Sequence, residues 1–222
     1  MVGKTNETVT TMKRTKCEGR NFFKRYKQIR SIARNGPWIN FAFVREPADR
    51  FLSGFLHVCR DSVTGHRDCE GCFGDMKCVL RKAFEYSQRF LVDKNVDSHL
   101  FWHVSPQNWH CEFRDNLESF KLVQYSPSRR DKVAEDLSEL LREGKVNDSD
   151  IDVIISQVSN GTTAHATNHR RNDQFSNEMQ NEEIKRLLVK VYFWDYILFN
   201  FPLPHVEIEK SDRNKIGLNV RN

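Results

Sequence analysis

An arginine and a serine lie close together in the stretch "FAFVREPADRFLSGF", residues 41–55, where an apolar run gives way to a helix pattern. A helix is expected to begin near Pro47, because proline is well tolerated in a first helical turn, and such a helix N-terminus attracts phosphate. Arg45 precedes it with a planar fork that suits phosphate oxygens, and Ser53 follows one turn later with a free hydroxyl. The stretch predicts a phosphate site. The alternative is a surface ion pair at Arg45 and a polar filler at Ser53.

Six cysteines offer either disulfide or metal chemistry: Cys17, Cys59, Cys69, Cys72, Cys78 and Cys111. Cys69 and Cys72 form a Cys-x-x-Cys pair, which occurs in zinc sites and in redox dithiols. Cys59 and Cys78 lack the spacing of a second zinc knuckle, and a polar loop is not the strand-to-helix turn of a dithiol. We therefore predict disulfides in the loop over residues 60–78, with the pairing undetermined.

The framework that positions these residues is predicted from an alternation of strand and helix patterns. "WINFAFV" and "FKLVQYS" predict buried strands over residues 38–44 and 120–126. Helices are predicted at about residues 21–33, from 47 onward, and at 75–92, 129–143 with Gly144 as the stop, 148–161 and 178–198. Along the helix from Pro47, Arg50, Ser53 and His57 lie on a polar side, and the apolar stripe consists of Phe51, Leu52, Phe55, Leu56 and Cys59. This order predicts the α/β fold class, as a single domain with a parallel sheet flanked by helices. Ligands bind such a sheet where a strand ends and a helix begins.

Composition narrows the class of ligand and the compartment. Lys and Arg total 35 against 30 for Asp and Glu, and this net charge of +5 favours an anionic ligand. Nucleic acid is not expected, because no zinc-finger, RNA-recognition or helix-turn-helix pattern is present. No apolar run reaches the roughly 20 residues of a membrane-spanning segment.

The cysteine content and the glycosylation sequons favour a secretory compartment, whereas the N-terminus has no apolar signal core. The sequons lie at Asn6, Asn147 and Asn160. Two explanations are open. Either the protein is cytosolic with free thiols, or its natural N-terminal anchor is absent.

Three motifs together resemble a known family. They are "R-E-P-x-x-R-x-x-S-x-F" from Arg45, "H-V-S-P-Q-N-W-H-C" from His103, and "H-A-T-N-H-R" from His165, which leads into "VYFWDYILFNFPLP". In this order, over about residues 36–204, they resemble the Golgi-type carbohydrate sulfotransferases. The resemblance is to the chondroitin 4-O-sulfotransferase-like group and its divergent nematode-type branch. Glu46 stands where that family more often has aspartate.

The resemblance implies a P-loop-like sulfotransferase fold and the sulfate donor PAPS (3'-phosphoadenosine 5'-phosphosulfate) as co-substrate, with no metal. The family's leading arginine and serine hold the 3'-phosphate, and these roles fall on Arg45 and Ser53. The implied acceptor is an acidic glycan or proteoglycan, with transfer to the 4-hydroxyl of N-acetylgalactosamine in chondroitin-like chains. The implied location is the Golgi lumen or membrane.

Sulfuryl transfer needs a base near the acceptor hydroxyl, and histidine suits this role because its pKa is ordinarily near neutrality. His103 is the predicted base, with His99 as the second candidate. The alternative for either is a hydrogen-bonded histidine in a structural turn. Arg170, Arg171 and Lys185 are candidates to line a glycan groove, although charged surfaces are usually only solvated.

The N-terminal region departs most from the family pattern. The family has an upstream strand, loop and helix that bind the 5'-phosphosulfate through backbone N–H groups and a cation. "GKTNETVTTM" loosely resembles that loop, and Lys4 is the predicted sulfate-contacting cation. We expect an N-terminally truncated chain, with residues 1–35 as a polar basic remnant, a sulfotransferase domain over 36–204, and a polar tail over 205–222.

Two other functions fit parts of this pattern. A catalytically inactive family member would bind donor nucleotide or glycan without turnover, because the phosphosulfate loop is degraded. An unrelated intracellular α/β protein would bind nucleotide or nucleic acid, and six free thiols would favour it.

Overall fold

A computed structural model describes residues 25–33, 38–60, 69–93, 96, 98–160 and 175–207, with no side-chain description for 31–33. The chain divides into two compact units. The first unit combines residues 1–46 with 107–166, and the second combines 47–106 with 167–222. Each unit is therefore built from two stretches that are far apart in the sequence.

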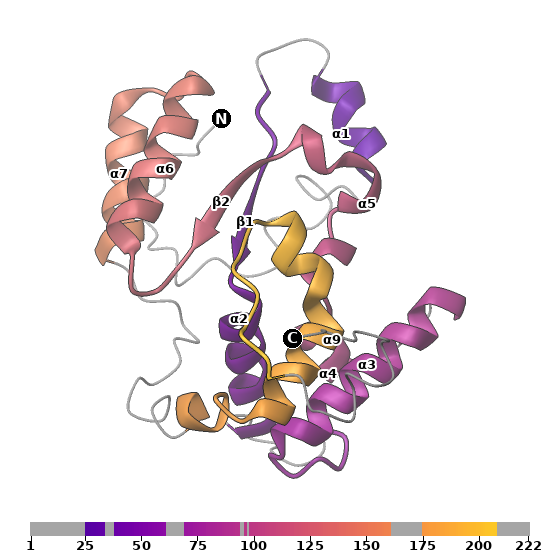
Figure 1. Cartoon of the computed structure of the whole chain (residues 1–222). Helices are drawn as coiled ribbons and strands as arrows, with labels where there is room; N and C mark the ends of the chain where they lie inside the picture. The colour runs from indigo at the N-terminus through magenta and orange to yellow at the C-terminus, as the bar shows by residue number, and fades with distance from the viewer. Residues whose placement is uncertain are drawn as a thin grey trace, which may run out of the picture. The chain divides into compact units, whose positions relative to one another are not determined.

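A parallel pair of strands forms the sheet of the first unit (Figure 1). Strand β1 (Phe41–Arg45) pairs with β2 (Lys121–Tyr125), so that Arg45 lies opposite Tyr125. Because the strands are parallel, both carboxyl ends meet at the same edge. The α/β class and the parallel sheet are confirmed.

The expectation that both strands are buried is wrong. Val44 and Val123 are the only buried residues of the two strands, whereas Phe41 and Phe43 are 38% and 47% exposed. Within the described residues the sheet has two strands, so each strand has a neighbour on one side only. The strand signal in the sequence was correct, because aromatic and β-branched residues suit a half-covered pleated surface.

Helix α6 (Arg130–Glu143) contacts β2 in the first unit, and α7 (Asp148–Asn160) contacts α6 (Figure 1). Val133 and Leu140 of α6 pack on Val123 of β2. Gly144 ends α6, as predicted, and its N–H donates to the carbonyl of Leu140 at 3.0 Å. The remaining elements of the unit are short: α1 (Tyr26–Ala33), η4 (Gln107–Trp109), α5 (Phe113–Asn116) and η5 (Leu117–Ser119).

Helices form the second unit. Helix α2 (Pro47–Phe55) starts at the predicted proline and continues into η3 (Leu56–Arg60), a π-helical segment. Helix α2 contacts α4 (His99–Val104) and α9 (Glu182–Leu198), and α3 (Met76–Asp93) contacts α9. The predicted apolar stripe of α2 and η3 is buried in the core: Phe51, Leu52, Phe55, Leu56 and Cys59.

The long C-terminal helix starts later than predicted because a cap interrupts the helix pattern. The side chain of Asn181 accepts hydrogen bonds from the N–H groups of Glu183 and Ile184, at 3.0 and 3.4 Å, and so fixes the start of α9 at Glu182. Residues 175–178 form a separate helical turn. Within α9, Tyr192 has non-helical backbone angles, and its hydroxyl donates to the carbonyl of Val104 at 2.6 Å.

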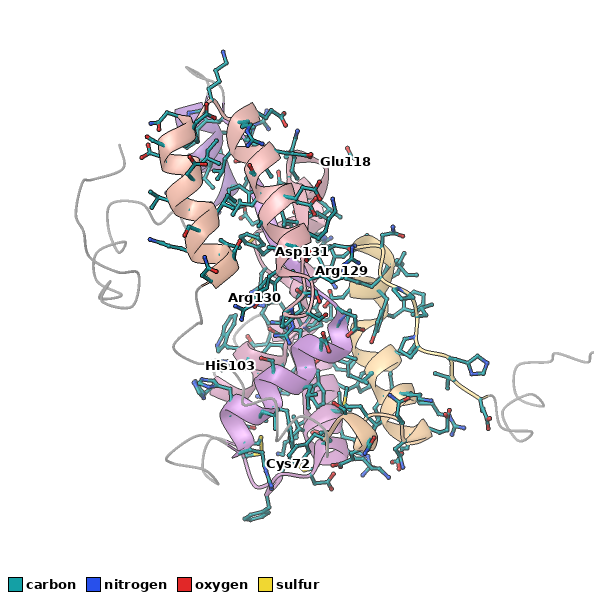
Figure 2. All side chains as sticks on the ribbon, turned by 90° about the vertical axis from the view of Figure 1, so that its left-hand side faces the viewer. Cys72, His103, Glu118, Arg129, Arg130 and Asp131 are labelled. Carbon is teal, nitrogen blue, oxygen red and sulfur yellow. A yellow bond between two sulfur atoms is a disulfide. The ribbon has the colours of Figure 1, made fainter. Side chains whose placement is uncertain are left out.

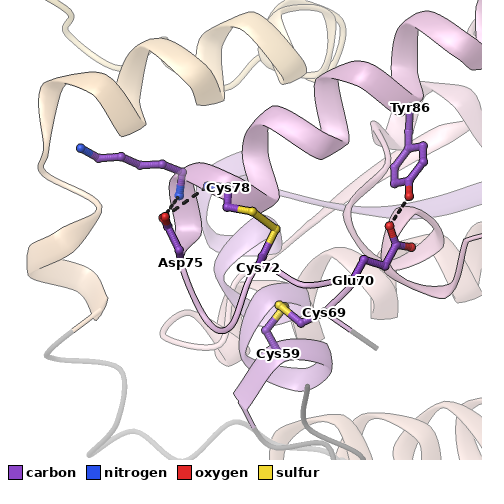
Figure 3. Close-up of a disulfide and its surroundings, with 8 residues drawn as sticks. Cys59, Cys69, Glu70, Cys72, Asp75, Cys78 and Tyr86 are labelled. Carbon is purple, nitrogen blue, oxygen red and sulfur yellow. Dashed lines mark hydrogen bonds between the residues drawn. A yellow bond between two sulfur atoms is a disulfide. The ribbon is translucent and has the colours of Figure 1, made fainter. Parts of the chain in front are cut away.

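Two disulfides close the polar loop, as predicted. Cys59 bonds to Cys69 and Cys72 bonds to Cys78, so the Cys-x-x-Cys pair is divided between two bridges (Figure 3). Cys111 is an exposed free thiol, and Cys17 lies outside the described residues. Among the helices that the structure describes, none combines the length and apolar character needed to cross a bilayer.

Candidate functional site

The backbone of Arg45 is held at the end of β1 by one side chain. The N–H of Arg45 donates to Oε1 of Gln107 at 2.9 Å, and Nε2 of Gln107 donates back to the Arg45 carbonyl at 2.7 Å. The buried amide of Gln107 therefore satisfies both backbone groups of Arg45. Gln107 belongs to the motif that begins at His103, and the sequence alone predicted no role for it. The available signal for a structural role was the position of Gln107 directly after Pro106 in that motif.

The guanidinium of Arg45 is the side-chain group that most directly indicates a bound anion. Its central carbon lies 5.9 Å from the ring centroid of Tyr125, while Nε is buried without a hydrogen-bond partner among the described residues. A buried donor without an acceptor is costly, so such a group requires an explanation. An anion bound at the carboxyl end of β1 would supply the acceptor.

More basic and hydroxyl groups follow β2 at the same edge of the sheet. The hydroxyls of Ser126 and Ser128 lie 2.9 Å apart. Arg129 and Arg130 come next, at the N-terminal end of α6 (Figure 2). The cap residue Arg129 makes no side-chain cap hydrogen bond. These residues add positive charge near the strand ends. The sequence "PSRR" directly after the predicted strand was a signal that the prediction did not use.

Ser53 lies half-buried on α2 in the second unit, on a helix that packs very closely on α4. A Cβ atom on the neighbouring Gly54 would come within 2.8 Å of the His103 carbonyl oxygen. Because real Cβ contacts are not that short, glycine is required for this approach of the two helices. Gly54 therefore sets the distance between the Ser53 helix and the helix that carries His103.

Three histidines are in ring contact in the second unit, and we name His57, His99 and His103 the histidine cluster. The ring centroid of His103 lies 5.0 Å from that of His57 and 4.7 Å from that of His99. His99 is exposed, whereas the other two are half-buried. A neutral imidazole has one nitrogen that accepts a proton, so the cluster provides the group that general-base chemistry needs.

Sequence reasoning placed His57 on the polar side of the helix but missed its contact with His103. His57 lies in η3, where the π-helical turn holds one more residue than an α-helical turn. Such π segments often occur at functional sites. No simple sequence pattern marks a π turn, so the contact could not be foreseen.

The second arginine of the motif has a structural contact. Nη1 of Arg50 donates to the carbonyl of Ser105 at 2.6 Å. Ser105 is the C-cap residue of α4. Arg50 therefore ties α2 to the end of the helix that bears His99 and His103 (Figure 2 labels His103).

Several predicted residues lie outside the described residues: Lys4, His165, Thr167, His169, Arg170 and Arg171. Lys185 is described, and its Nζ pairs with Glu182 at 2.8 Å along α9. Trp102 and Trp194 are 51% and 60% exposed, so they are not core aromatics. Within the described part of the chain, no group of three or more His, Cys, Asp or Glu side chains is arranged to hold a metal ion.

Comparison with known proteins identifies the class. The model of the sulfotransferase family matches residues 3–202, and the chain therefore belongs to this family. The carbohydrate sulfotransferase chst-1 of Caenorhabditis elegans is 26% identical over 196 residues, which cover 83% of this chain and 60% of that protein.

Two further relatives come from the same nematode. The putative sulfotransferase vep-2 is 26% identical over 164 residues, covering 68% of this chain and 49% of its own length. The protein C18B2.2 is 25% identical over 200 residues, covering 86% of this chain and 56% of its own length. The chain thus spans about half the length of the curated relatives it matches. No solved structure gives a significant match.

Proposed function

We propose that the protein is a carbohydrate sulfotransferase that moves a sulfuryl group from PAPS to a glycan hydroxyl. Membership of the sulfotransferase family and the relative named as a carbohydrate sulfotransferase support this proposal. The single observation that carries it is the buried Nε of Arg45 at the carboxyl end of a parallel strand, which has no hydrogen-bond partner among the residues that the structure describes. A family arginine in that state has the chemistry of a phosphate ligand.

In this proposal Arg45 and Ser53 hold the 3'-phosphate of PAPS. The guanidinium supplies charge and two parallel donors, and the serine hydroxyl supplies a further donor. Lys4 is the proposed cation at the sulfate end of the donor. Holding both ends of the donor would orient the sulfur toward the acceptor and lower the entropic part of the barrier.

The proposed base is His103. Its imidazole accepts the proton of the acceptor hydroxyl as the hydroxyl oxygen attacks the sulfur atom of PAPS in line. The bond from sulfur to the phosphate oxygen then breaks. The products are a sulfate ester on the sugar and adenosine 3',5'-bisphosphate, while His103 carries the proton. The scheme requires no metal.

The proposed acceptor is a chondroitin-like glycan, with transfer to the 4-hydroxyl of N-acetylgalactosamine in the Golgi lumen. An acidic chain suits a protein with a net charge of +5. The exposed indoles of Trp102 and Trp194 have faces on which sugar rings can stack. The two disulfides agree with folding in an oxidising compartment.

The test is transfer of radiolabelled sulfate from PAPS to desulfated chondroitin, with unsulfated heparosan as the control acceptor. We expect label on chondroitin, and disaccharide analysis should place it at the 4-position of N-acetylgalactosamine. Label on heparosan alone would refute the proposal that a chondroitin-like glycan is the acceptor. Binding of adenosine 3',5'-bisphosphate without transfer to either glycan would refute the enzyme and favour an inactive family member.

A further inference from the structure

Glu70 links three separate segments of the second unit. Its carboxylate accepts hydrogen bonds from the hydroxyl of Ser98, at 2.5 Å, and from the hydroxyl of Tyr86 on α3 (Figure 3 shows the contact with Tyr86). Glu70 has a φ of 52°, a left-handed conformation that is uncommon for a side chain of this size. Such a conformation persists only where surrounding contacts hold it.

Ser98 connects Glu70 to the N-terminal end of α4. It is the N-cap residue, and its hydroxyl oxygen accepts the N–H of Phe101 at 3.0 Å while its hydroxyl proton goes to Glu70. Helix α4 has only six residues, so it depends on contacts with the rest of its unit rather than on its own propensity. Leu100 and Val104 pack in the core, and the Ser98 cap holds the first turn. Glu70 therefore holds the start of α4.

The opposite end of α4 is held from other elements. Arg50 donates to the carbonyl of Ser105, and Tyr192 donates to the carbonyl of Val104. His99 and His103 lie between these two ends. With both ends held, the backbone that carries the two imidazoles is fixed relative to α2.

A disulfide connects Glu70 to the third histidine. Cys69 immediately precedes Glu70, and it bonds to Cys59, which lies two residues after His57 in η3 (Figure 3). The same bridge therefore anchors the segment of His57 and the loop of Glu70. The Cys69–Glu70 segment is therefore connected to all three histidines: to His57 through the disulfide, and to His99 and His103 through Ser98 and α4.

We infer that Glu70 is a positioning residue for the histidine cluster: its carboxylate, anchored by the Cys59–Cys69 disulfide, fixes α4 and with it His103. A carboxylate suits this task because it accepts hydrogen bonds from two hydroxyls at once, and bonds to an ionised acceptor are stronger than neutral ones. Burial, followed by the hydrogen bond to Glu70, raises the pKa of Tyr86, so its hydroxyl keeps its proton to a higher pH than that of an ordinary tyrosine. The consequence for catalysis rests on the proposed function.

The first test is hydrogen exchange of the α4 backbone amides in the full chain, comparing the wild type with Glu70→Ala. We expect the amides of Trp102, His103 and Val104 to exchange about tenfold faster or more, the effect of losing a hydrogen bond to a charged group. Glu85→Ala is the matched control, because Glu85 is an exposed carboxylate on α3. Unchanged exchange in folded Glu70→Ala would overturn the inference.

A second pair of variants separates the cap from the link to Glu70. Ser98→Asp keeps an N-cap acceptor but cannot donate to Glu70, so it should speed exchange of the α4 amides as Glu70→Ala does. Adding Glu70→Gln to Ser98→Asp supplies an amide donor and should slow the exchange again. If the double variant exchanges as fast as Ser98→Asp alone, the direct contact is not what holds α4.

The catalytic consequence is read from the sulfate-transfer assay. Glu70→Ala should lower kcat about tenfold, while KM for PAPS stays within about twofold, because the base is displaced and the donor site is not. Faster exchange with unchanged kcat would overturn the positioning role in catalysis. No transfer by the wild-type chain, with the exchange difference intact, would overturn the proposed function and support the positioning of the cluster.

Discussion

The end of β1 and the histidine cluster are held by different kinds of interaction. Arg45 lies on a strand whose backbone is fixed by pairing with β2 and by two hydrogen bonds to Gln107. His103 lies on a six-residue helix whose place depends on side chains from elsewhere in its unit. The difference shows that the proposed phosphate ligand is set by a backbone ladder, whereas the proposed base is set by side-chain contacts. Single substitutions should therefore displace the base more easily than the phosphate ligand.

The largest effect is expected for His103→Asn, which tests the catalytic role of the histidine cluster without changing the end of β1. Loss of a general base should lower kcat by about 10²- to 10⁴-fold, since that is the usual contribution of such a group. The affinity for adenosine 3',5'-bisphosphate should not change, because Arg45 and Ser53 remain. Steady-state kinetics and calorimetry measure the two quantities.

His205→Asn is the control for this substitution, because His205 is an exposed histidine outside the helices. It should leave kcat unchanged. A kcat for His103→Asn within about threefold of the wild type would remove His103 from the base role.

A smaller effect is expected for Gly54→Ala, which acts on the packing under the histidine cluster. The added Cβ would meet the His103 carbonyl oxygen at 2.8 Å, and overpacking of this kind costs about 1–3 kcal/mol of unfolding free energy. Urea unfolding measures that loss. Gly144→Ala is the matched control, since its nearest contact would be 3.4 Å. Equal stability of the two variants would show that α2 and α4 do not pack as closely as described.

The smallest effect is expected for Tyr192→Phe, which removes one hydroxyl that holds the end of α4. Loss of the hydrogen bond to the Val104 carbonyl should cost about 0.5–1.5 kcal/mol near neutral pH. Burial, with a smaller contribution from Asp195, raises the pKa of Tyr192, while Arg50 opposes the shift.

The dependence of the free energy of unfolding on alkaline pH gives a second test of the same hydroxyl. Because the pKa is raised in the folded state, the unfolded chain releases the tyrosine proton first. The contribution of the protonated Tyr192 hydroxyl to the free energy of unfolding is complete below the unfolded pKa of about 10, and it is lost as pH rises above that value. Urea unfolding across this range should show a steeper alkaline loss for the wild type than for Tyr192→Phe. Parallel curves would contradict the burial of this hydroxyl.

Sequence reasoning succeeded where a local signal decides the structure. The apolar run before Arg45 and the proline at position 47 fixed the change from strand to helix, and Gly144 marked the end of α6. These boundaries depend on backbone restrictions of single residues, which are visible in any sequence.

The candidate site was only partly predictable, because its geometry depends on contacts between distant segments. Helix α4 is too short to show a helical period, and the π turn at His57 has no residue signature. The disulfides were expected, but six cysteines allow 15 complete pairings, so Cys59–Cys69 could not be chosen from the sequence. Glu70 is an ordinary loop residue until its partners are known.

The account depends most directly on Arg45 as the ligand of a 3'-phosphate. The measurement is calorimetric titration of Arg45→Ala and of the control Arg114→Ala, an exposed arginine, with adenosine 3',5'-bisphosphate and with adenosine 5'-phosphate. For the bisphosphate, Arg45→Ala should weaken binding by about 1.5–3 kcal/mol, the value of a hydrogen bond to a charged group. For the monophosphate, which lacks the 3'-phosphate, the two variants should bind alike. Equal bisphosphate affinity in both variants would contradict the central claim.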